Sequence, residues 1–192
     1  MDSVINFISI LAYALYFMLP AYMANISALA FGGGTPVDLN RNFWDGRRLI
    51  GDGVTWRGTI IGILLGTTIA VLQGIIFMYY GDIFTLIPQW VTIEGIIPGN
   101  FIEWILLGLA LSGGALIGDA VGSFIKRRIK IGRGKPAPFL DQLDFAVVAL
   151  IFASLVVIIP LTIIILILIF TIILHVAANT IAYLLGIKDV WY

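Results

Sequence analysis

Cysteine is absent from the 192 residues of this chain, and histidine occurs once, at position 175. These absences exclude disulfide bonds, thiolate zinc sites, cysteine nucleophiles and any single-chain metal site built from several histidines. Charged residues are also scarce, at 11% of the chain, and their signs balance to a net charge of zero. The chain as a whole therefore offers no electrostatic attraction to nucleic acid, and its few charges are informative through their positions.

The abundant residues are apolar: they make up 60% of the chain and give it a mean hydropathy of +1.07. This composition predicts an all-α integral membrane protein, with one polytopic domain over residues 1–192. A helix needs about 20 residues to cross a bilayer, and the apolar stretch 145–186 would be about 60 Å long as one helix, so we divide it near Pro160. Five transmembrane helices are expected, at roughly 4–30, 59–80, 101–125, 138–159 and 161–186.

Two polar loops, 31–58 and 126–140, separate these spans and carry most of the charge. With five spans, all eleven basic residues fall on one side of the membrane. Because basic residues favour the cytoplasmic side, both loops and the C-terminus are expected in the cytoplasm and the N-terminus outside. The two loops then face the compartment that holds nucleoside triphosphates and can form one nucleotide site. The basic residues on this side are Arg41, Arg47, Arg48, Arg57, Lys126, Arg127, Arg128, Lys130, Arg133, Lys135 and Lys188.

The polar end of the third span carries the strongest chemical signal. In a helix, the side chains of Asp119, Ser123, Lys126 and Lys130 fall within an arc of roughly 60°. A carboxylate can bind a divalent cation, and the cation and the lysines together can bind a polyphosphate. A stop-transfer signal is the alternative, but a carboxylate inside an apolar helix is costly without a partner, so Asp119 favours a metal–phosphate site. Arg128 points away from this face, and we expect its replacement to cost little activity.

The first loop is dense in arginine, glycine and carboxylate residues. Glycines at 46, 51, 53 and 58 let backbone amides come close to a ligand, so we interpret the loop as functional rather than as a solvated connector. At the start of the fourth span, Asp141 and Asp144 are three residues apart; they either stabilise the helix dipole or belong to the metal site. His175 and Asn179, four residues apart in the last span, are expected to hydrogen-bond inside the bundle.

Two motifs resemble a known family. Gly118-Asp119, Ser123 and Lys126-Arg127 form the pattern G-D-x-x-x-S-x-x-K-R, and an acidic segment follows it at Leu140-Asp141-Gln142-Leu143-Asp144. This ordered combination resembles the signature of the CDP-diacylglycerol synthase family. The first-loop segments D-G-R-R (45–48) and G-D-G-V-T-W-R-G (51–58) look like the archaeal branch of that family, the CDP-archaeol synthases.

The resemblance implies a membrane nucleotidyltransferase of phospholipid biosynthesis that depends on CTP and Mg²⁺. In that reaction the phosphate of unsaturated archaetidic acid attacks the α-phosphorus of CTP, and pyrophosphate leaves. The nucleophile is already an anion, so no general base is needed, while metal and basic side chains stabilise the developing charge. The catalytic residues would be Asp119, Lys126, Arg127 and Asp144, with Asp119 and Asp141 as magnesium ligands. The CTP-binding residues would be Asp45, Arg47, Arg48, Asp52, Gly53, Thr55, Arg57, Ser123 and Lys130.

Two other functions are compatible with the sequence. A CTP-dependent kinase for polyprenol or dolichol-type alcohols would use the same groups but transfer the γ-phosphoryl group. A small membrane transporter would place ionisable residues at mid-membrane in several spans, where only His175 is found. Position 54 also has two interpretations, because the loop pattern of the family that this chain resembles usually has lysine where this chain has Val54. Either a lysine here would contact a phosphate, or the valine anchors the loop by burying its side chain.

Overall fold

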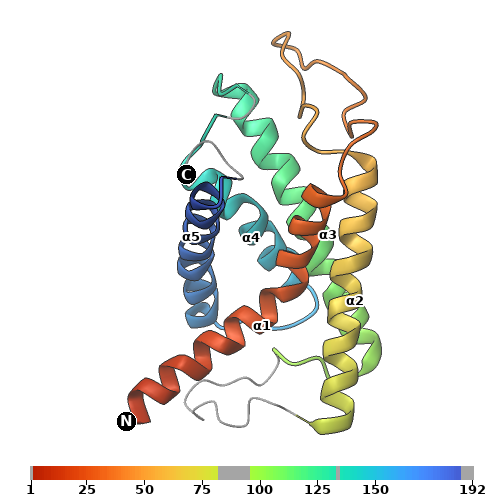
Figure 1. Ribbon diagram of the computed structural model, residues 1–192. Helices are drawn as coiled ribbons and strands as arrows, with labels where there is room; N and C mark the ends of the chain where they lie inside the picture. Colours follow the sequence, from red (N-terminus) through yellow and green to blue (C-terminus); the bar gives the residue numbers. More distant parts are fainter. Residues whose placement is uncertain (1, 82–95, 133–134, 187–192) are drawn as a thin grey trace.

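The structure is a computed structural model that describes residues 2–81, 96–132 and 135–186. These residues form five α-helices: α1 (Asp2–Ala30), α2 (Trp56–Tyr80), α3 (Phe101–Arg128), α4 (Leu140–Ala153) and α5 (Leu161–Leu184). Successive helices run in alternating directions, so the first loop (31–55) and the second loop (129–139) lie at the same end of the bundle (Figure 1). The predicted all-helical membrane fold is confirmed, and its two polar loops lie together.

Four of the described helices, α1, α2, α3 and α5, are long and apolar enough to cross a membrane. α4 has 14 residues, about 21 Å of helix, and ends at Ala153 rather than near 159. The described part of the chain therefore holds four candidate spans and one shorter helix in place of five full spans. The predicted break near Pro160 is present, since this residue immediately precedes α5. α3 extends past its predicted end at 125, so the basic residues 126–128 are helical.

Glycines of α2 bring this helix into close contact with α1. A Cβ atom added at Gly58 or Gly62 would lie 2.7 Å from a carbonyl oxygen of α1, closer than side chains tolerate. Hydrophobic attraction between helices is weak in lipid, so such close approach of backbones, with Cα–H groups facing carbonyl oxygens, stabilises the pair instead. The facing residues are Gly58 and Ala28, Gly62 and Ala24, and Gly66 and Pro20.

Pro20 lies inside α1, a helix that changes direction along its length (Figure 1). Proline has no N–H, so the carbonyl of Tyr16, four residues earlier, loses its usual helical donor. The buried side chain of Gln73 in α2 replaces that donor, with its Nε2 2.7 Å from the Tyr16 oxygen. An unpaired carbonyl in hydrocarbon is costly, so Gln73 stabilises the bundle at the point where the proline interrupts α1.

Candidate active site

The first loop is folded around one buried carboxylate, Asp38, which is 5% exposed. It accepts hydrogen bonds from the backbone N–H groups of Ile50 at 3.0 Å and Gly51 at 2.8 Å, and a further one from Asn40. Arg48 adds a two-point pair, with Nη2 2.8 Å from one carboxylate oxygen and Nε 3.2 Å from the other. Burial opposes ionisation, but Arg48 and the three N–H groups outweigh it and hold the pKa of Asp38 well below its usual range.

The first loop is fastened to the end of α3. From the loop, Arg47 donates through Nη1 to the carbonyl oxygens of Arg127 at 3.4 Å and Arg128 at 3.1 Å, which end the helix. From the helix, Arg128 donates to the carboxylate of Asp45 at 2.9 Å and to the carbonyl of Arg48 at 2.6 Å. Two segments that are far apart in the sequence therefore form one surface.

An open cavity of about 480 Å³ lies where the two loops meet. Of the eight described residues that line it, half are cationic, and the one acidic residue among these eight, Asp52, is paired with Arg48 at 2.9 Å. Gly51 has a φ of 112°, and a side chain there would project toward the guanidinium of Arg127. A basic cavity of this volume suits the phosphates of a nucleotide. The lining residues are Arg47, Arg48, Gly51, Asp52, Arg127, Lys130, Ile131 and Gly132.

A second group of charges forms where α3 meets α4. The Nζ atom of Lys126 lies 2.8 Å from Oδ1 of Asp141, whose other oxygen accepts from the N–H of Ala137 at 2.9 Å. Asp119 is half-buried on the same face of α3 as Lys126. Its charge interacts with those of Lys126, Asp141 and Asp144. The structure thus brings together the carboxylates that the sequence motifs singled out.

Glycines of α3 allow this close approach. A Cβ atom at Gly118 would lie 2.7 Å from the Cα of Phe145, and one at Gly122 would collide with the carboxylate of Asp144. Asp144 is held in place by the N–H of Phe145, 2.7 Å from its Oδ1. These two glycines and Gly114 have the four-residue spacing of closely packed membrane helices, a sequence signal that could have predicted the α3–α4 contact.

A magnesium ion commonly binds one or two protein carboxylates and takes phosphate oxygens and water as its other ligands. Asp119 fits this role, because it accepts no hydrogen bond within the described part of the chain and lies near two other carboxylates. Asp141 would first have to release Lys126. Across the described residues, no three acidic or histidine side chains are close enough to hold a metal by themselves. The donor set therefore fits an ion shared with phosphates, and the predicted Asp119–Asp141 pair stays a prediction.

Several predicted nucleotide ligands lie outside the cavity lining. Thr55 is buried and caps the start of α2, where its Oγ1 accepts a backbone N–H at 3.2 Å. Gly53 and Arg57 are exposed, and Ser123 is half-buried on the Asp119 face of α3. Val54 is only 8% exposed, which agrees with the interpretation that it anchors the loop.

The expectation that Arg128 matters little does not fit its contacts. Arg128 does point away from Asp119, but α3 continues far enough to aim its side chain at the first loop, where it bonds to Asp45. The sequence also did not point to Asp38. Its only local signal was the pair Asp38-x-Asn40, a spacing common in turns, which says nothing of its bonds to Arg48.

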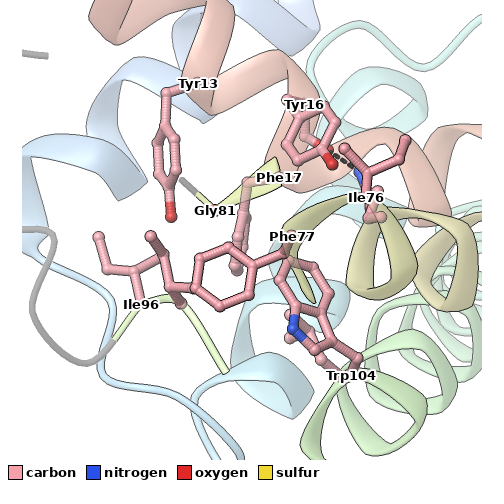
Figure 2. A pocket seen from close by; sticks show the side chains of 11 residues that line it. Tyr13, Tyr16, Phe17, Ile76, Phe77, Gly81, Ile96 and Trp104 are labelled. Carbon is pink, nitrogen blue, oxygen red and sulfur yellow. Dashed lines mark hydrogen bonds between the residues drawn. The ribbon is translucent and has the colours of Figure 1, made fainter. Parts of the chain in front are cut away.

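A second cavity, of about 30 Å³, lies at the opposite end of α2 between α1, α2 and α3 (Figure 2). Its walls are mostly apolar and include the rings of Tyr13, Phe17, Phe77 and Trp104. The indole Nε1 of Trp104 is buried there and finds no hydrogen-bond acceptor within the described residues. The space is too small for a nucleotide, and none of the described residues that line it is cationic, so the basic cavity between the loops is the candidate active site.

Comparisons with known proteins show what the whole chain is similar to. A family model described as "CarS-like: CDP-archaeol synthase" matches residues 7–192. The CDP-archaeol synthase of Methanocaldococcus jannaschii is 53% identical over 97% of this chain and 99% of the relative. That of Methanothermobacter thermautotrophicus is 53% identical over 98% of this chain and 98% of the relative. A solved structure of an intramembrane enzyme for archaeal membrane lipids biosynthesis has a TM-score of 0.70 and 35% identity, and covers 86% of this chain and 92% of that one.

Proposed function

The chain belongs to the CDP-archaeol synthase family, and from this membership we propose how its two loops carry out the transfer. The protein is a membrane enzyme of lipid biosynthesis with CTP-dependent cytidylyltransferase activity. In the proposed reaction, a phosphate oxygen of unsaturated archaetidic acid forms a bond to the α-phosphorus of CTP, and the bond from that phosphorus to the bridging oxygen breaks. The products are CDP-archaeol and pyrophosphate.

One observation carries this assignment: the cationic cavity lies at the same end of the bundle as the carboxylates of α3 and α4. We assign the triphosphate to this cavity, with Arg47, Arg48 and Lys130 bonding to its oxygens. Lys126 and Arg127 occupy adjacent positions on α3, the first paired with the carboxylate of Asp141 and the second lining the cavity. They are suited to stabilise charge that develops at the α-phosphorus. Because the lipid phosphate is already an anion, no residue has to remove a proton.

Mg²⁺ accompanies the triphosphate in this proposal. Asp119 would be the protein ligand of the ion, and Asp141 would contribute only if it released Lys126. Asp144, packed against Gly122, lies beside these groups and remains a catalytic candidate. When bound, the ion neutralises the triphosphate oxygens and the leaving pyrophosphate.

An assay with purified protein, Mg²⁺, CTP labelled in its cytidine and a lipid phosphate tests the function. The label is expected to enter the lipid, with pyrophosphate released in equal amount. A CTP-dependent kinase would instead convert the labelled CTP to CDP when a lipid alcohol is the acceptor. Label found only in CDP, or in neither product, would overturn the proposal.

The metal assignment is tested by Asp119→Asn, which keeps the size of the side chain but removes its charge. We expect turnover to fall by about 100-fold or more, because the ion loses its charged protein ligand. Glu103→Gln is the matched control: Glu103 lies in the first turn of the same helix, at the end remote from the loops, and should leave turnover near the wild-type value. Near-normal turnover of Asp119→Asn with unchanged Mg²⁺ dependence would show that the assignment is wrong.

A further inference from the structure

We infer that Arg128 is a positioning residue for the transfer: it fixes the first loop on the end of α3 and thereby places Arg47 and Arg48 in the nucleotide cavity. Arg128 does not line the cavity itself, so it acts through the residues that do. The inference rests on the proposed function, because the position of the loop matters to catalysis only if the cavity binds CTP.

The first support is that hydrogen bonds run in both directions between loop and helix. Arg47 caps the last carbonyls of α3, where the negative end of the helix dipole favours a cation. Arg128 bonds back to the Arg48 carbonyl and to the Asp45 carboxylate. The same oxygen of Asp45 also accepts the backbone N–H of Arg47 at 3.1 Å. Arg128 therefore holds the segment 45–48 at both of its ends.

The second support is an aromatic setting for the guanidinium. Its central carbon lies 4.8 Å from the centre of the Phe43 ring and 4.9 Å from that of Phe124. Phe43 belongs to the first loop and Phe124 to α3, and the two rings meet edge to face at 88°. The Nε atom of Arg128 is buried and has no acceptor in the described part of the chain, so the ring faces stabilise its charge there. Arg128 thus lies at the joint between the two elements.

Lysine cannot reproduce this arrangement. A planar guanidinium can bond to two acceptors and lie over an aromatic ring at once, whereas an ammonium group is a compact and strongly hydrated point charge. Arg128→Lys therefore keeps the positive charge at the end of α3 and removes the geometry. We expect it to loosen the first loop and to leave the helix bundle folded.

Limited trypsin digestion of the nucleotide-free protein measures the loop directly, since cleavage after Arg47 or Arg48 requires the loop to leave α3. Arg128→Lys is expected to be cleaved there about tenfold faster than the wild type, with an unchanged melting temperature. Arg41→Lys makes the same substitution at an exposed position of the same loop and is expected to match the wild type. Equal cleavage of Arg128→Lys and the wild type would overturn the inference, whatever the transfer activity of the wild type proves to be.

Kinetics provide the second readout. Arg128→Lys is expected to raise the KM for CTP about tenfold and to leave kcat near the wild-type value at saturating CTP, because bound nucleotide restores the loop. Asp45→Asn removes the carboxylate that Arg128 contacts. The double variant should have a KM for CTP no higher than that of Arg128→Lys alone, because both substitutions break the same contact between Arg128 and Asp45. A positioning role would be contradicted if the increases in KM of the two single variants multiplied in the double variant. It would also be contradicted if Arg128→Lys lowered kcat and left KM unchanged.

Discussion

Asp38 shows how a single buried charge can shape a site without being part of its lining. A carboxylate removed from water is tolerated only where hydrogen bonds replace the lost water. Asp38 obtains them from Arg48 and from the N–H groups of Ile50 and Gly51. Because Arg48 and Gly51 line the cavity between the two loops, the position of this carboxylate helps to shape one wall of that cavity.

The lowered pKa of Asp38 predicts how the first loop responds to acid. A carboxyl group whose pKa is lower in the folded than in the unfolded state contributes stability above its ordinary value of 3.8, and that contribution is lost as the pH falls below it. Hydrogen exchange at the amides of Ile50 and Gly51, corrected for intrinsic rates, should be slow at neutral pH and accelerate below that value. Asp38→Asn should accelerate it by about tenfold or more at neutral pH, and the difference from the wild type should shrink in acid, where Asp38 also loses its charge. Exchange in the variant that matches the wild type at neutral pH would contradict this account.

Val54 provides a second prediction for a single residue. Its side chain is buried and its carbonyl accepts the N–H of Val37 at 3.0 Å, so the residue closes the base of the first loop. Val54→Lys buries an ammonium group there and should lower the free energy of unfolding by about 2 kcal/mol or more, measured by thermal unfolding in detergent. Val54→Ile is the control that keeps the side chain apolar. A folded Val54→Lys protein that binds CTP more tightly would instead place this position beside a phosphate.

The contact between α3 and α4 depends on glycine at one position of α3. A methyl group at Gly122 would collide with the Asp144 carboxylate, whereas one at Gly113 would meet no atom within 4 Å. Gly122→Ala should therefore displace α4 at a cost of about 1–3 kcal/mol and reduce turnover, while Gly113→Ala should keep both stability and turnover. Melting temperature and kcat of the two variants test this. Equal behaviour of the pair would show that the register of α3 against α4 differs from the one described.

The sequence predicts those features of the helices and loops that depend on patterns among neighbouring residues, and it does not predict the others. The lengths of the apolar stretches predicted the helices, and helical spacing predicted that Asp119 and Lys126 share a face. Both predictions depend only on residues that are close together in the chain. The end of α4 was missed, since residues 155–159 are as apolar as the helix before them. The contacts of Arg128 with Phe43 and Asp45 were missed for a different reason: they depend on how the first loop folds, which no periodicity describes.

For the whole molecule, the unequal distribution of charge predicts which end faces the cytoplasm. The chain has no cysteine, so a single introduced cysteine gives an unambiguous label. Trp44→Cys lies in the first loop at a position that is 96% exposed, and Gly99→Cys lies at the opposite end, also exposed. A membrane-impermeant maleimide added to intact cells should label Gly99→Cys and not Trp44→Cys. The reverse result would place the proposed nucleotide site outside the cell. Asp82 and Glu94, two further positions suited to this test, lie outside the described residues.

The position of Asp119 along α3 has a consequence for the kinetics of the enzyme. Asp119 is nine positions before Arg128, so it lies about 14 Å along the helix from its last residue. In the proposed reaction, the lipid presents its phosphate to this position while its chains stay in the leaflet, and the soluble nucleotide is the substrate that has to travel. The rate should then follow the mole fraction of lipid phosphate in the membrane rather than its amount per volume of solution. Adding inert lipid at constant total substrate should slow the enzyme by surface dilution, whereas adding buffer that contains CTP at the same concentration should not.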